Sequence, residues 1–128
     1  MAERAVSALC QAAFWLPLGV CTWLALVPAP PDAIMRISDV VQHGAAFAWL
    51  AFALRLAFPR RGPLAVAGWM FGYGVLIEVV QAAGGARVGE FGDLAVDVAG
   101  IAIGLVAYRL GGARTRTLID RAVRVLVR

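Results

Sequence analysis

Four long apolar runs, separated by short polar connections, make up most of this 128-residue chain. A helix needs about 20 mostly apolar residues to cross the hydrocarbon core of a bilayer, and each run is close to that length. The runs cover approximately residues 9–27, 40–58, 64–83 and 91–110. With 62% hydrophobic and 16% charged residues, the chain has too little polar surface for a soluble domain. The sequence therefore predicts an all-α, polytopic membrane protein with four transmembrane helices.

The arginines are distributed unequally between the two sides of the membrane. An even number of spans places both termini on one side. That side holds Arg4, the Arg60–Arg61 pair and the arginines of the C-terminal segment, whereas the other side holds Arg36 and Arg87. The positive-inside rule then places both termini in the cytoplasm. The net charge of +4 fits anchoring to anionic lipid better than binding to nucleic acid.

The composition also predicts which kind of membrane holds the protein. All twelve basic residues are Arg, and Ala and Gly are abundant, which is typical of a GC-rich bacterial genome. We therefore expect a multi-pass protein of the bacterial cytoplasmic (inner) membrane. The first run is expected to remain as a span and not to be cleaved as a signal peptide, because it is long for such a segment and Val27-Pro28-Ala29 is a poor cleavage site.

The C-terminal segment differs in character from the rest, so we divide the chain into a four-helix domain, residues 1–110, and a basic cytoplasmic tail, residues 111–128. Thr117 is a plausible N-cap for a short helix. An apolar stripe follows it, with arginines on the other faces; its members are Leu118, Ile119, Ala122, Val123 and Leu126. This pattern predicts a basic amphipathic helix on the membrane surface, with a disordered tail as the alternative.

The acidic residues and the single His within the apolar runs all lie toward the predicted outer face. An Asp at the centre of a spanning helix costs about 2.5 to 3.5 kcal/mol on insertion scales, so such residues are expected to be used. They begin the second run, end the third, occupy the following loop and begin the fourth. In chain order, the candidate site residues are Asp39, His43, Glu78, Gln81, Arg87, Asp93 and Asp97.

Within each run, the two polar residues lie three or four positions apart and so share one helix face. Gly100 and Gly104 continue the stripe of Asp97 inward, and Gly74 lies one turn before Glu78. Small residues allow another helix to approach closely in a membrane bundle. We therefore predict that the polar faces of three helices converge on one outward-facing ligand site.

Most of these residues also have a structural alternative. Glu78 gives the strongest support for a functional site, because it lies well inside its run and cannot be a helix cap. The alternatives are helix caps at Asp39 and Asp93, and packing hydrogen bonds or ion pairs at His43, Gln81, Arg87 and Asp97.

The motifs resemble those of the VanZ-like family of small bacterial membrane proteins. The matching pattern is Asp39-x3-His43 with Phe47, then Glu78-x2-Gln81, then Arg87-x5-Asp93-x3-Asp97-x2-Gly100-x3-Gly104. The resemblance covers about residues 9–110. It implies an association with low-level resistance to the glycopeptide antibiotic teicoplanin. The chain departs from the family pattern at three positions, with Val40 in place of a usual Lys, Gly44 in place of a frequent Phe, and Asp97 where Asn is common.

Two classes of function fit this sequence. The first is a binding protein, without catalytic residues, cofactor or metal, for a polar or anionic-headed envelope lipid or cell-wall precursor. This class is favoured because the sequence has a single His, no placed nucleophile and no Gly-rich phosphate loop. The alternative is an intramembrane enzyme acting on such a headgroup, with Glu78 or Asp97 as general base and His43 as acid. A proton-coupled transporter is a weaker third hypothesis.

Overall fold

The computed structural model describes residues 1–27, 31–32, 37–84 and 91–126. Within these ranges the chain forms four helices and no strand: α1 (Ala2–Leu26), α3 (Asp39–Ala57), α4 (Pro63–Ala83) and α5 (Phe91–Leu126). All four are long and apolar enough to cross a membrane, which confirms the all-α, four-span prediction. The second and third predicted spans agree with α3 and α4 to within one residue at each end.

Large apolar side chains cover the outside of the bundle. Leu64, Trp69 and Ile103 are 86%, 67% and 63% exposed. Such a surface would promote association in water, but lipid tails are as apolar as these side chains. The buried core is built around α3, which contributes more than half of its members; they are Phe14, Phe47, Leu50, Ala51, Ala53, Ala57, Val66, Met70 and Ile101.

The closest helix pair is α3 and α5, and glycines make its approach possible. A Cβ atom added at Gly100 would lie 2.6 Å from the Gly44 carbonyl oxygen. One added at Gly104 would collide with the Ala48 carbonyl oxygen. The backbones therefore touch along a line that we call the α3–α5 seam, formed by Gly44 and Ala48 of α3 and by Gly100 and Gly104 of α5. The close approach was predicted from the glycine spacing, and the structure identifies α3 as the partner.

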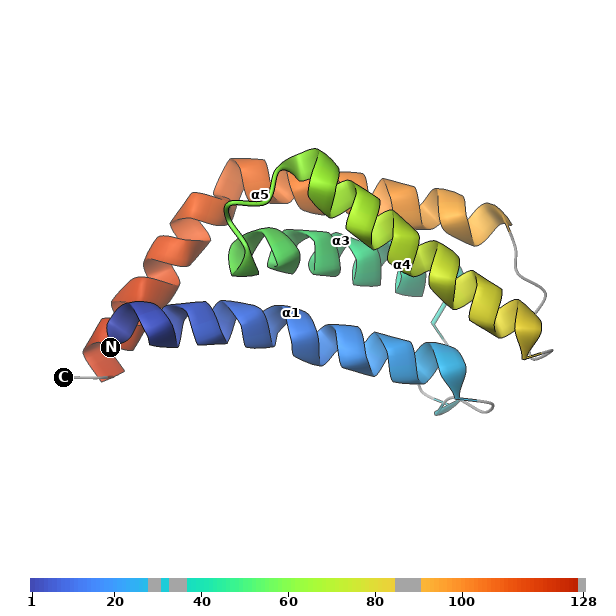
Figure 1. Cartoon of the computed structure of the whole chain (residues 1–128), viewed down its shortest axis with the longest axis horizontal. Coiled ribbons are helices and arrows are strands. Elements are labelled where there is room, and N and C mark those ends of the chain that lie inside the picture. Colours follow the sequence, from blue (N-terminus) through green and yellow to red (C-terminus); the bar gives the residue numbers. More distant parts are fainter. Residues whose placement is uncertain (28–30, 33–36, 85–90, 127–128) are drawn as a thin grey trace.

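The fourth span and the tail form one continuous helix. The predicted boundary after Leu110 is not a break, because α5 continues through Gly111 and Gly112 to Leu126. Figure 1 shows that α5 bends part-way along, and Gly pairs are common points of helix bending. Thr117 does not cap a new helix. It lies inside α5, where its hydroxyl donates to the Ala113 carbonyl oxygen at 2.9 Å.

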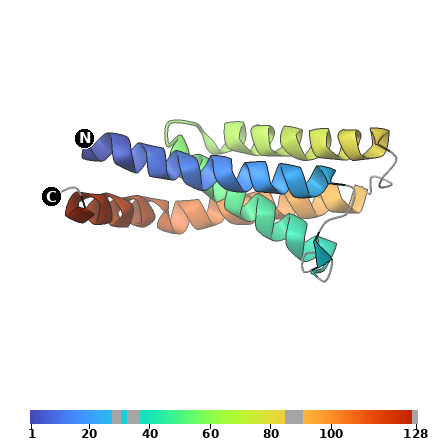
Figure 2. The same cartoon turned by 90° about the horizontal axis from the view of Figure 1, so that it is seen from below.

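The end of α5 packs against the start of α1. Val123 lies in a small apolar cluster with Val6, Cys10 and Leu56. Arg116 donates from its guanidinium to the Leu56 carbonyl oxygen at 2.8 Å, which ties the tail to the end of α3. Figure 2 shows the last turns of α5 beside the first turns of α1. Part of the predicted amphipathic stripe is therefore used for contact within the protein.

Candidate functional site

The polar residues gather where α1 and α4 end and where α3 and α5 begin, at the end of the bundle opposite the start of α1 (Figure 1). We call this the polar end. Its described members from the predicted set are Asp39, His43, Glu78, Gln81, Asp93 and Asp97. Arg87, the seventh predicted site residue, lies outside the described residues.

A hydrogen-bonded pair joins α3 to α5 at this end. His43 Nδ1 lies 2.9 Å from Asp97 Oδ1, and the exposed fractions of the two side chains are 18% and 2%. The pair shares one hydrogen bond between Nδ1 of His43 and Oδ1 of Asp97, so Nε2 is the imidazole nitrogen left for other contacts. The pair lies directly next to the seam, because His43 precedes Gly44 and Asp97 lies one turn before Gly100.

Helix α4 approaches the same pair closely at Gly74, which has no side chain. A Cβ atom at Gly74 would lie 2.9 Å from Asp97 Oδ2 and 3.2 Å from the Phe47 ring. Glu78 follows one turn later and is 9% exposed, so it faces the bundle and not lipid. Three helices therefore bring their polar side chains together here.

Gln81 makes a specific contact with the remaining helix. Its side-chain Nε2 donates to the Ala25 carbonyl oxygen of α1 at 2.8 Å, and the residue is 8% exposed. The last turn of a helix leaves carbonyl groups without intrahelical partners, and this bond satisfies one of them. The Nε2 group of the Gln81 amide thus holds α4 against α1.

The two acids that begin helices are the more open members of the site. Asp39 is the first residue of α3 and is exposed, while Ser38 occupies the N-cap position without a side-chain capping bond. Asp93 lies in the first turn of α5 and is half-buried. Negative charge in a first turn is favourable toward the helix dipole. Neither acid is buried as deeply as Asp97.

One contact at this side of the bundle was not predicted from the sequence. The hydroxyl groups of Thr22 and Tyr73 lie 2.9 Å apart and connect α1 to α4. Thr22 also donates to the Leu18 carbonyl oxygen at 2.7 Å, which leaves Tyr73 as the donor between the two hydroxyls. The only sequence signal for this contact is the presence of hydroxyl groups inside two apolar runs.

Chemically, the polar end combines one imidazole with several carboxylates in a largely apolar bundle. The described residues contain no group of three or more His, Cys, Asp or Glu side chains arranged to hold a metal ion. The arrangement is suited to hydrogen bonding and to balancing a positive charge. It can also move a proton through His43.

The family comparison agrees with the pattern of residues. A model of the VanZ/LLP1 family matches residues 6–112, a stretch that includes the predicted site from Asp39 to Asp97. No curated protein matches the chain, and no solved structure matches it. The family match covers most of the chain and confirms the VanZ-like resemblance. The chain belongs to the VanZ/LLP1 family.

Proposed function

We propose that this VanZ-like membrane protein binds an envelope molecule with a polar or anionic headgroup at its polar end, which faces outward. The observation that carries the proposal is the pair of half-buried His43 and buried Asp97, 2.9 Å between nitrogen and oxygen, with Gly74 beside Asp97 and buried Glu78 one turn further along α4. Ionisable side chains at membrane depth are costly and commonly mark functional sites.

The charge balance indicates which headgroup fits. Among the predicted site residues that the structure describes, the polar end carries four carboxylates, those of Asp39, Glu78, Asp93 and Asp97, against one imidazole. Like charges at low dielectric destabilise one another unless a positive group compensates them. By sequence, Arg36 and Arg87 supply two such groups on this side of the membrane. A zwitterionic headgroup supplies another, with its amine toward the acids and its phosphate toward Arg87.

The orientation in this proposal comes from the arginine asymmetry. In this orientation the protein spans a bacterial inner membrane with both termini in the cytoplasm, and the polar end lies at the opposite face of the membrane. A phosphatase reporter that is active only outside the cytoplasm tests this directly. We expect no activity when it is fused after Arg128, and activity when it is inserted between Gly84 and Gly89. The reverse result would turn the site inward and contradict the outer-face proposal.

The ligand itself can be identified from the purified protein. We expect mild detergent extraction followed by mass spectrometry of bound lipids to recover one headgroup class enriched over the bulk membrane. Arg87→Ala should reduce that enrichment, while Asp120→Asn, at the far end of α5, should leave it unchanged. Bound lipid that merely reproduces the membrane composition would refute the proposal. An effect on teicoplanin susceptibility, which the family resemblance implies, would follow from altered handling of this molecule.

The His43–Asp97 geometry also favours one second candidate, an intramembrane enzyme acting on the same headgroup. An Asp that accepts from Nδ1 and leaves Nε2 as the base is the arrangement that orients a catalytic His in hydrolases. Asp97→Asn separates the two functions. Asn still accepts the hydrogen bond through its side-chain oxygen, so ligand binding should change little, whereas catalysis that depends on the carboxylate would fall by orders of magnitude. A turnover that Asp97→Asn abolishes would establish the enzyme.

A further inference from the structure

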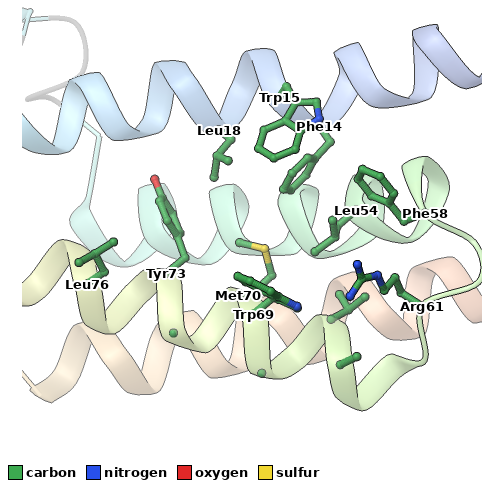
Figure 3. A pocket seen from close by; sticks show the side chains of 14 residues that line it. Phe14, Trp15, Leu18, Leu54, Phe58, Arg61, Trp69, Met70, Tyr73 and Leu76 are labelled. Atoms are coloured by element: carbon green, nitrogen blue, oxygen red, sulfur yellow. The ribbon is translucent and has the colours of Figure 1, made fainter.

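An apolar groove lies between α1 and α4, away from the polar end. Figure 3 shows Phe14 and Leu18 of α1 facing Met70 and Tyr73 of α4 across it, with Leu54 of α3 among the lining residues. Its volume of about 760 Å³ is within the range of small-molecule sites. We refer to this space as the α1–α4 groove.

The groove is closed at one end and open at the other. Near the polar end, the Thr22–Tyr73 and Gln81–Ala25 hydrogen bonds hold α1 and α4 together. Toward the start of α4 the two helices diverge, as Figure 1 shows. Arg61 lies at this wide end of the groove, whereas Leu76 lies at the narrow end (Figure 3).

The length of the groove matches one leaflet of a bilayer. Its lining on α4 runs from Ala65 to Leu76. Eleven residues of helix span about 16 Å at 1.5 Å per residue. The hydrocarbon core of a bilayer is about 30 Å thick, so the groove covers about half of it. A lipid tail from a single leaflet has this reach, whereas a transmembrane helix of a partner would extend across both leaflets.

The mouth of the groove is positively charged. Arg60 and Arg61 are adjacent there, and the sequence contains no Asp or Glu between Val40 and Ile77. The Arg61 guanidinium has no hydrogen-bond or ion-pair partner within the described part of the chain. An arginine at the membrane surface attracts anionic lipid by about 1 kcal/mol. The positive charge at the mouth thus fits the headgroup of an anionic lipid, and the apolar lining fits its acyl chain.

We propose that the α1–α4 groove holds one acyl chain of an anionic phospholipid from the leaflet beside the α3–α4 connection, with the lipid phosphate at Arg61. This is a second site, separate from the polar end and independent of the function proposed for it. The bound chain fills the space that α1 and α4 leave between them.

A second copy of this chain is the main competing occupant. Gly68 and Gly72 on α4 form a small-xxx-small pattern, which often mediates helix pairing in membranes. A Cβ atom added at either glycine would meet no atom within 4 Å, so this face of α4 is open in the single chain. The same openness provides a clean test, because a larger side chain can be placed there without a clash.

The test uses the purified chain in nanodiscs of equal parts phosphatidylglycerol and phosphatidylcholine, released and weighed by native mass spectrometry. We expect the chain to appear as a monomer that retains one phosphatidylglycerol. Gly72→Leu, which fills the groove, should abolish this retention. Gly19→Leu, on a face of α1 that is equally open and outside the groove, should leave it unchanged.

Arg61→Ala provides the second arm. It should lower the preference for phosphatidylglycerol over phosphatidylcholine about fivefold, the factor that corresponds to one surface arginine. Two outcomes would overturn the proposal. One is lipid retention that is the same in wild type and Gly72→Leu. The other is a dimer in wild type that Gly72→Leu converts to a monomer, which would assign the groove to a second copy.

Discussion

The α3–α5 seam and the α1–α4 groove are two interfaces in one small bundle, and they are built in opposite ways. Along the seam, glycines let two backbones touch, and the His43–Asp97 pair lies directly beside the contact. Along the groove, mostly large apolar side chains line an open space, and the α1–α4 hydrogen bonds found among the described residues lie toward one end. The α3–α5 seam leaves no space for another molecule, whereas the α1–α4 groove leaves room for a lipid.

This difference follows from the solvent. Lipid tails are as apolar as Leu, so helices in a bilayer gain little from burying apolar side chains against each other. They associate where small residues permit close van der Waals contact or where polar groups need partners. The seam has both features. In the groove, Gly68 and Gly72 of α4 have no close neighbour, so α1 and α4 remain apart there and their side chains stay available to lipid.

The largest expected effect comes from adding a methyl group to the seam. Gly104→Ala places a Cβ against the Ala48 carbonyl oxygen, so α3 and α5 must separate. We expect a loss of about 3 kcal/mol in the free energy of unfolding, measured by circular dichroism during SDS titration. Gly72→Ala is the matched control, because its Cβ meets open space, and it should be nearly neutral. Equal effects at the two positions would erase the distinction between seam and groove.

A smaller effect is expected from breaking the polar pair beside the seam. His43→Ala leaves the buried Asp97 carboxylate without its hydrogen-bond partner, which should cost about 2 kcal/mol of unfolding free energy. Asp97→Asn keeps an acceptor for Nδ1 and should cost less than about 1 kcal/mol. The same SDS titration measures both variants. If Asp97→Asn were as destabilising as His43→Ala, the negative charge and not the hydrogen bond would hold the pair together.

The smallest effect concerns the bridge that closes the groove. A double-mutant cycle with Thr22→Val and Tyr73→Phe should give a coupling energy of about 0.6 kcal/mol, the average for hydrogen bonds between membrane helices. The two single variants serve as controls for each other. A coupling energy of zero would mean that Thr22 and Tyr73 do not hold α1 to α4, and that the narrow end of the groove is not a fixed point.

The sequence predicts the helices and their polar faces well, because both depend on residues close together in the chain. Apolar runs of about 20 residues locate the spans, and three- and four-residue spacings locate the faces. The glycine stripe at Gly100 and Gly104 also predicts a close approach. What the spacing cannot supply is the partner helix, since the contact of Gly104 with Ala48 joins residues far apart in the chain.

The same limit applies to the site and the tail. Convergence of polar faces was predicted, but the pairing of His43 with Asp97 and the bond from Gln81 to Ala25 depend on the tertiary arrangement. The tail was predicted as a helix on the membrane surface because its apolar stripe is visible locally. Its packing of Val123 against Val6 is a long-range contact that no local pattern indicates.

The most direct test of the central claim, that the polar end is a ligand site, is to measure binding and stability together in Glu78→Gln. The substitution keeps the size of the side chain and removes one negative charge from the polar end. We predict that Glu78→Gln loses most of the envelope molecule that copurifies with wild type, measured by mass spectrometry per mole of folded protein. Its unfolding free energy should stay within about 1 kcal/mol of the wild-type value. Undiminished retention of that molecule in a folded Glu78→Gln protein would contradict the account.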